Sequence, residues 1–275
     1  PAVRAPRAQA DRDIYRQVMT ETLLNQPCLT VLAGRVDALI VKGGTVHGVT
    51  LSDGENFFAP AVIMTTGTFL QGLIHIGSKK MAAGRIGEPR AEKASDSLRE
   101  LGFTLGRLKT GTPPRLEAHS IDFSKTIPQW GDPIPTPFSY STESIDIDQL
   151  PCYLTYTNDK THDVIRAHIG ESPLYSGVIS GVGPRYCPSI EDKVVKFSTQ
   201  NRHQVFLEPE GRNSSLIYPN GVSTSMPEAV QLEFIRTIAG LENVIMARPG
   251  YAIEYDYVPP YQLHPTLETR QISGL

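Results

Sequence analysis

Residues 29–68 decide the fold; their sequence is LTVLAGRVDALIVKGGTVHGVTLSDGENFFAPAVIMTTGT. Three short runs rich in β-branched residues lie in this stretch, over residues 29–32, 38–41 and 46–51. Gly-Gly and Asp-Gly dipeptides follow the second and third runs and favour tight turns, so the runs predict short strands. A fourth run, residues 61–64, has no polar alternation and leads into Thr66-Gly67-Thr68. This pattern is typical of a buried parallel strand that ends in a ligand-binding loop.

Apolar residues at helical spacing predict helices on both sides of these strands. Ile14, Val18 and Leu23 recur within residues 7–25, and Pro27 closes that segment. Further helices are predicted over residues 91–101, from Pro188 onwards, and from a capping pattern at Ser225 to Gly240. Strands and helices together indicate an α/β protein.

Residues 251–257 alternate in character, which predicts a half-buried strand. One face carries Tyr251, Ile253, Tyr255 and Tyr257, and the other carries Ala252, Glu254 and Asp256. A row of tyrosines favours packing within a sheet, with stacking on bases as the alternative.

The strand pattern of residues 29–68 resembles the second half of a flavin-binding Rossmann domain, in which a small β-meander interrupts the sheet. Any other α/β crossover is the alternative, because the chain contains no G-x-G-x-x-G phosphate loop. Four prolines around Trp130 in residues 127–137 predict a loop and an internal boundary.

Composition excludes several classes of protein. The 275 residues are 40% hydrophobic, enough for a buried core, and the formal net charge of −3 argues against binding nucleic acid by bulk charge. No run approaches the roughly 18 apolar residues of a membrane helix, so we expect no membrane span. Cys28, Cys152 and Cys187 are odd in number and far apart, which favours reduced thiols in a cytosol-like compartment. No Cys/His cluster suggests a metal site.

A basic segment over residues 79–115 contrasts with the acidic remainder. It holds nine Lys or Arg residues against four acids, a local charge of +5. The segment favours an anionic partner, although a solvated helix over residues 91–101 explains part of the charge. Candidate anion-binding side chains are Arg85, Arg107, Lys109 and Arg115.

The stretch around Cys187 is the sharpest local signal for chemistry. Ser189-x-x-Asp192 is a capping pattern, so Cys187 is expected just before a helix N-terminus, where the helix dipole and Arg185 favour a thiolate. Glu191 and Asp192 oppose that effect, and the alternative is a small buried side chain.

The other candidate groups are weaker. Cys152 lies in an apolar run and is expected to be structural. His162 and His203 are possible acid/base groups, but no partner spacing singles either of them out.

Five motifs together identify a family resemblance. They cover residues 66–77, 106–115, 183–193, 218–225 and 248–256. In this order they closely resemble the MnmG/GidA family of tRNA uridine 5-carboxymethylaminomethyl modification enzymes, over essentially the whole chain.

The resemblance implies an FAD-dependent enzyme that modifies carbon 5 of the wobble uridine (U34) of tRNA together with an MnmE-type GTPase. Methylenetetrahydrofolate would supply the one-carbon unit, and NADH would reduce the flavin. The family also implies a homodimer and a cytoplasmic location, or an organellar one in a eukaryote.

The fold implied is α/β: part of a Rossmann-like FAD-binding domain with β-meander, plus an inserted α/β NAD-binding-like domain. Residues 1–115 and 241–275 are assigned to the FAD-binding domain, and residues 116–240 to the inserted domain, which would bind NAD or substrate. The family's phosphate loop and its C-terminal helical domain have no counterpart here, so we expect a central fragment that is inactive alone.

Site residues follow from the same motifs. Cys187 matches a functionally important cysteine. Val36, Thr66, Gly67 and Ser95 are assigned to FAD. The stretch assigned to NAD consists of Gly183, Pro184, Arg185, Tyr186, Cys187, Pro188, Ser189, Ile190, Glu191, Asp192, Lys193, Val194, Val195, Lys196 and Phe197. Alternatives are a folate- and FAD-dependent tRNA uridine methyltransferase and a tRNA-binding scaffold without catalysis.

Overall fold

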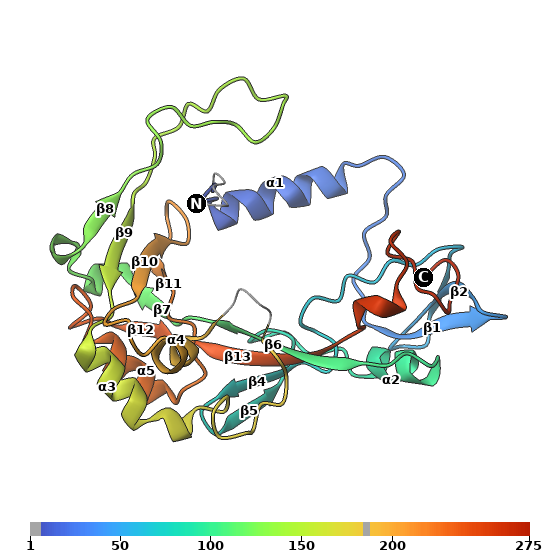
Figure 1. Ribbon diagram of the computed structural model, residues 1–275. Helices are drawn as coiled ribbons and strands as arrows, with labels where there is room; N and C mark the ends of the chain where they lie inside the picture. Colours follow the sequence, from blue (N-terminus) through green and yellow to red (C-terminus); the bar gives the residue numbers. More distant parts are fainter. Residues whose placement is uncertain (1–6, 184–187) are drawn as a thin grey trace.

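The computed structural model describes residues 7–183 and 188–275 (Figure 1). Its α-helices are α1 (Arg12–Leu24), α2 (Lys93–Glu100), α3 (Asp159–Ala167), α4 (Ile190–Lys196) and α5 (Glu228–Ile235). The strands form three sheets in the described part of the chain, and neighbouring strands in each sheet run antiparallel. The chain is therefore a mixed α/β protein, as the sequence predicts.

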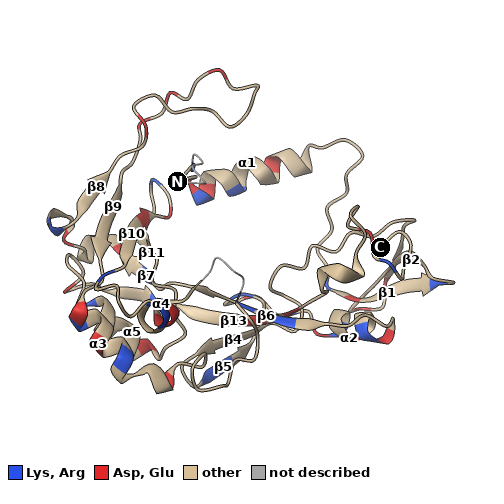
Figure 2. Cartoon of the chain, in the orientation of Figure 1, with Lys and Arg blue, Asp and Glu red and all other residues tan. Residues whose placement is uncertain are grey.

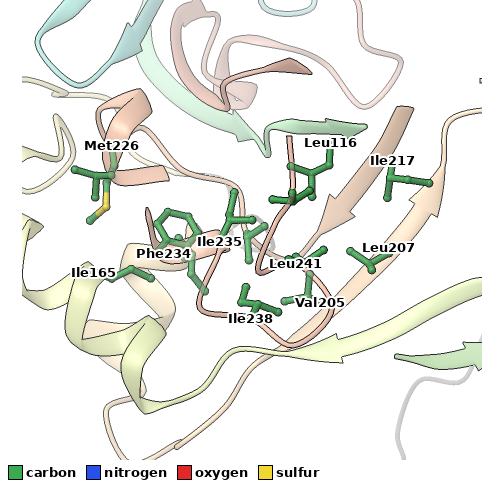
Figure 3. Close-up of a cluster of buried hydrophobic side chains, with 14 of the residues drawn as sticks. Leu116, Ile165, Val205, Leu207, Ile217, Met226, Phe234, Ile235, Ile238 and Leu241 are labelled. Atoms are coloured by element: carbon green, nitrogen blue, oxygen red, sulfur yellow. The ribbon is translucent and has the colours of Figure 1, made fainter. Parts of the chain in front are cut away.

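A six-stranded sheet builds the largest core. Its order is β12 (Met246–Arg248), β7 (Arg115–Glu117), β11 (Leu216–Asn220), β10 (Gln204–Pro209), β9 (Cys152–Tyr156) and β8 (Ile127–Gln129). Helices α3, α4 and α5 pack against it, and their apolar side chains meet those of the strands, as Figure 3 shows for Phe234, Leu116 and Val205. Each fully buried side chain of this size contributes roughly 1.5–3 kcal/mol by leaving water.

A four-stranded sheet lies beside this core, in the order β5 (Lys79–Ala82), β4 (Leu73–Ile76), β13 (Tyr251–Tyr257) and β6 (Gly106–Thr112). The predicted strand is confirmed as β13, but its tyrosines are half-buried while Ile253 on the same face is buried, so burial does not alternate strictly. The buried face is the one that carries Glu254 and Asp256. The tertiary structure thus encloses a polar face.

The β-meander predicted from residues 38–51 is confirmed as β1 (Val36–Lys42), β2 (Thr45–Leu51) and β3 (Asn56–Phe58). Helix α2 packs on β1, where the Ser97 hydroxyl accepts a hydrogen bond of 3.1 Å from the Leu39 amide.

Two predicted strands are wrong. Residues 29–32 and 61–64 form no strand, and Ile63 is 88% exposed. An interior strand needs hydrogen-bonded neighbours on both sides. The backbone bond recorded for residues 61–64 runs from the Val62 amide to the Gly274 carbonyl, at 2.9 Å, so no ladder forms in the described chain.

The helix predicted over residues 7–25 is confirmed as α1, whose N-cap Asp11 accepts bonds from the amides of Asp13 and Ile14. None of its residues is buried, so its apolar side faces solvent. Its first turn is tied to the six-stranded sheet by an ion pair of 2.6 Å between Arg12 and Glu210.

Candidate functional site

The motif segments that lie far apart in the sequence converge around α4. The Ile190 amide donates to the Ser223 carbonyl at 2.8 Å, and the Lys109 amide donates to the Val182 carbonyl at 3.1 Å. The hairpin turn between β4 and β5 joins them, because the Gly77 amide donates to the Ser225 carbonyl at 2.6 Å. Residues 251–256 pair with residues 107–112 across β13 and β6, so tertiary contacts gather parts of all five motifs in one region.

Helix α4 begins where the capping pattern predicts. The Ser189 hydroxyl accepts from the Asp192 amide at 3.2 Å, and the Asp192 carboxylate accepts from the Ser189 amide at 3.4 Å. The capping box predicted for α5 at Ser225 is wrong, since the N-cap there is Pro227 without a side-chain bond. The Ser225 amide donates instead to the carboxylate of Glu191, at 3.1 Å.

Glu191 is the centre of a buried polar cluster that sequence reasoning placed only within the NAD stretch. Its side chain has 0% exposure, and its Oε1 accepts from the Thr224 hydroxyl at 3.0 Å and from the Ser172 hydroxyl at 3.2 Å. Its Oε2 has no hydrogen-bond partner among the described residues. The carboxylate thus fixes the 223–225 loop to α4.

Asp192, also on α4, contacts a second group of polar side chains. Lys196 Nζ lies 2.7 Å from Oδ1, and Lys109 Nζ lies 3.6 Å from Oδ2. Burial raises the pKa of Asp192, but the two lysines and the Ser189 amide outweigh burial and leave it below the ordinary value. The Tyr175 hydroxyl donates to Asp192 at 3.3 Å, and burial together with this carboxylate raises the pKa of Tyr175 to about 12.

A second buried carboxylate, Glu254 of β13, holds the loop that leads to Gly183. Its Oε1 accepts from the amides of Ser180 and Gly181 at 2.9 and 2.8 Å, and its Oε2 lies 3.0 Å from Nε2 of His75. Burial raises the pKa of Glu254, but these hydrogen bonds outweigh burial and lower it overall. Burial lowers the pKa of His75, whose Nδ1 has no partner among the described residues.

Three of the four predicted anion-binding side chains are engaged by largely buried carboxylates of the same chain. Arg107 donates to Asp256 at 2.9 Å, Lys109 lies near Asp192 as described, and Arg115 pairs with Glu210. Arg85 is the exception, with a 66% exposed side chain and an exposed partner, Glu88, at 3.3 Å. A role of these four cations towards an external anion stays a prediction.

The residues assigned to FAD lie in two places. Val36 begins β1, and Ser95 lies on α2, which packs on β1. The Ser95 hydroxyl has 0% exposure and no hydrogen-bond partner among the described residues.

Thr66 and Gly67 form a separate turn, closed by a 3.0 Å bond from the Phe69 amide to the Thr66 carbonyl. Gly67 has a φ of 53° and is exposed, and a Cβ placed on it would only reach ordinary contact with Phe69 at 4.0 Å, so a ligand can approach the backbone. An unsatisfied hydroxyl and an accessible glycine turn fit a bound dinucleotide.

Of the remaining candidate residues, some lie in the described part of the chain and one does not. Cys187, with residues 184–186, lies outside the described residues. Burial raises the pKa of Cys152, which agrees with a structural role. His162 is buried and hydrogen-bonded at 2.8 Å to Thr157, and burial lowers its pKa.

Two further kinds of feature are absent from the described ranges. Within the described ranges, no group of three His, Cys, Asp or Glu residues could hold a metal ion. No helix there combines the length and apolar character that crossing a membrane requires.

Known proteins resemble this chain over its full length. It is 56% identical over 275 residues to the tRNA uridine 5-carboxymethylaminomethyl modification enzyme MnmG of Geobacter sulfurreducens, and 54% identical to the MnmG of Bacillus licheniformis. Each alignment covers 100% of this chain and 44% of the relative, so the chain spans less than half of the relatives' length.

A solved structure, Aquifex aeolicus GidA, superposes with a TM-score of 0.91 at 51% identity, over 97% of this chain and 46% of that one. The family model described as glucose inhibited division protein A, GIDA, matches residues 1–275. The chain belongs to the GidA family.

Proposed function

We propose that the protein carrying this chain is an FAD-dependent enzyme that modifies carbon 5 of the wobble uridine (U34) of tRNA. The observation that carries the proposal is the convergence of the five motifs around α4, in a chain 56% identical to a protein named for that reaction. The product would be a carboxymethylaminomethyl or aminomethyl group. Methylenetetrahydrofolate would supply carbon, and an MnmE-type GTPase would act with the enzyme.

The cofactor assignments are part of this proposal. Val36, Thr66, Gly67 and Ser95 would hold FAD, which supplies reversible hydride transfer when bound. The segment 183–197 would bind NADH. Glu254 supports it at Gly181 and Glu191 supports it within α4, so both of its described flanks are anchored by buried carboxylates.

Cys187 would act on the base. Its thiolate would add to carbon 6 of uridine, and the electron pair of the 5,6 double bond would then make carbon 5 nucleophilic. After the one-carbon unit joins carbon 5, loss of the proton from carbon 5 would expel the thiolate and restore the double bond. A supporting role in shaping the nicotinamide site is the alternative for this residue.

We also propose the domain boundaries, the cellular location and the oligomeric state of the full protein. Residues 1–115 and 241–275 would belong to the FAD-binding domain, and residues 116–240 to an inserted NAD- or substrate-binding domain. The full protein would be a cytoplasmic homodimer.

The test uses full-length protein with Cys187→Ser and, as the matched thiol control, Cys152→Ser. Flavin absorbance, NADH oxidation and the mass of the modified nucleoside would be measured with the GTPase partner. A normal flavin spectrum with lost modification in Cys187→Ser alone would support the role at the base. Full modification by Cys187→Ser would refute that role, and a product carrying only a methyl group would refute the proposed reaction.

A further inference from the structure

A long arm, residues 130–150, projects from the six-stranded sheet between β8 and β9 (Figure 1). Its hydrogen bonds stay within the arm: Gln149 donates to the Asp132 carbonyl at 2.8 Å, and the Thr142 amide donates to the Ser139 carbonyl at 3.3 Å. Nothing in the described chain fastens the arm to the body of the protein by a hydrogen bond or an ion pair.

The arm is both apolar and acidic. Its exposed large apolar side chains are Trp130, Ile134, Phe138, Tyr140, Ile147 and Leu150. Its charged side chains are Asp132, Glu143, Asp146 and Asp148, and no Lys or Arg occurs between residues 126 and 159. Figure 2 shows acidic positions alone along the arm. A contiguous exposed patch of this kind indicates a protein contact, and the acidic charge argues against tRNA as the occupant.

The same chain carries a surface of complementary character. A groove of about 650 Å³ lies between the β4–β5 hairpin and α5, with Ile76, Leu232 and Met246 in its wall. Two cations, Lys79 and Arg236, and one carboxylate, Glu228, also line this groove, which leaves its lining net positive. Lys79 is exposed on β5 and pairs with no carboxylate among the described residues.

The groove continues into a sheet edge. Among the described strands, β5 pairs on one side only, with β4, and all four of its residues are exposed. An open edge leaves backbone donors and acceptors that an extended segment can pair with.

An arm cannot reach the groove of its own chain. In Figure 1 the arm extends beyond α1 on one side of the molecule, whereas α5 and the β4–β5 hairpin lie on the opposite side. A two-fold dimer would seat each arm in the groove of the other copy and satisfy both contacts at once.

We propose that the acidic, apolar arm of residues 130–150 docks in the basic groove beside β5 of a second copy of this chain. The apolar side chains of the arm cover Ile76, Leu232 and Met246, and its carboxylates face Lys79 and Arg236. The inference rests on the proposed homodimer and assigns it a contact.

Photo-cross-linking in the full-length protein tests the location. p-Benzoylphenylalanine would replace Tyr140 in the arm and, as the control, Phe58, which is 74% exposed on β3. Mixing unlabelled with ¹⁵N-labelled protein separates cross-links between copies from those within one copy. The expected result is a cross-link between copies from position 140 to residues 76–81 or 228–246. A cross-link elsewhere, including to parts of the protein outside residues 1–275, would overturn the proposal.

Charge reversal tests the complementarity. Asp146→Lys with Asp148→Lys gives one variant, and Lys79→Glu gives the other. Each alone is expected to raise the dimer dissociation constant at least about tenfold by sedimentation. Mixed together they should form a tight heterodimer, because one contact has both charges reversed and the other is native. Reversal of Lys42 and Glu100, exposed outside both surfaces, is the control.

These measurements distinguish failure of the arm contact from failure of the homodimer itself. A dimer that tolerates both reversals would refute the arm contact and leave the homodimer standing. A protein that sediments as a monomer at every concentration would refute the homodimer and the arm contact together.

Discussion

Two buried regions of this protein are built from opposite kinds of side chain. The core under the six-stranded sheet is apolar, with Phe234, Ile235 and Leu207 fully enclosed. The region around α4 and β13 encloses carboxylates instead, among them Glu191 and Glu254. Apolar packing tolerates many volume-conserving rearrangements at small cost, whereas a buried carboxylate needs donors at fixed places. The polar region therefore specifies the geometry of the motif segments more strictly than the apolar core does.

The largest expected effect belongs to the apolar core. Phe234→Ala removes a side chain of 0% exposure and should lower the free energy of unfolding by about 3–5 kcal/mol. The matched control is Val18→Ala on α1, where the side chain is 52% exposed and the loss should stay below about 0.5 kcal/mol. Urea denaturation of the chain measures both values, and equal losses at the two positions would contradict the comparison.

A smaller loss is expected in the polar region. Glu254→Ala leaves the buried Gly181 amide and the His75 ring without their acceptor, which should cost about 2–3 kcal/mol of unfolding free energy. Glu254→Gln retains one acceptor oxygen and should recover part of that loss. If Ala and Gln are equally destabilising, the contribution of Glu254 is its charge rather than its geometry.

The smallest expected effect is on the pH dependence of the unfolding free energy, to which the polar region contributes and the apolar core does not. Because the folded-state pKa of Glu254 lies below its ordinary value, its stabilisation is present above the unfolded pKa and is lost as pH falls through the folded one. The unfolding free energy of the native protein should fall more steeply between pH 6 and 3 than that of Glu254→Gln. Phe234→Ala should keep the native slope, since no titrating group is removed. Parallel profiles for the native protein and Glu254→Gln would argue against a lowered pKa.

Local patterns predicted much of the fold. The strand runs of residues 38–51, the helices α1 and α2, and the capping box of α4 all form as expected, because turns, caps and periodicity act over a few residues. The fourth run, residues 61–64, was predicted as a strand but forms none, because a strand depends on more than its own sequence. Its apolar character is a local property, but a buried strand requires neighbours that the described chain does not supply.

The sequence predicted which segments form the candidate site, but not how these segments contact one another in space. The motif over residues 183–193 was found, while the pairing of its loop with Glu254 was not. The exposed basic segment expected at residues 79–115 also changed character, since Lys109 is buried beside Asp192. Charge counted along a sequence does not reveal which carboxylates lie opposite it in space.

The sequence by itself determined the family motifs, the meander, the positions where helices begin, and the acidic, apolar composition of the arm. Tertiary structure alone decided which face of β13 is buried and which carboxylate anchors each motif. His75 and Glu254 lie 179 residues apart in sequence and 3.0 Å apart in space. Burial and pairing are set by such distant partners, because the environment of a side chain depends on everything packed around it and not on its neighbours along the chain.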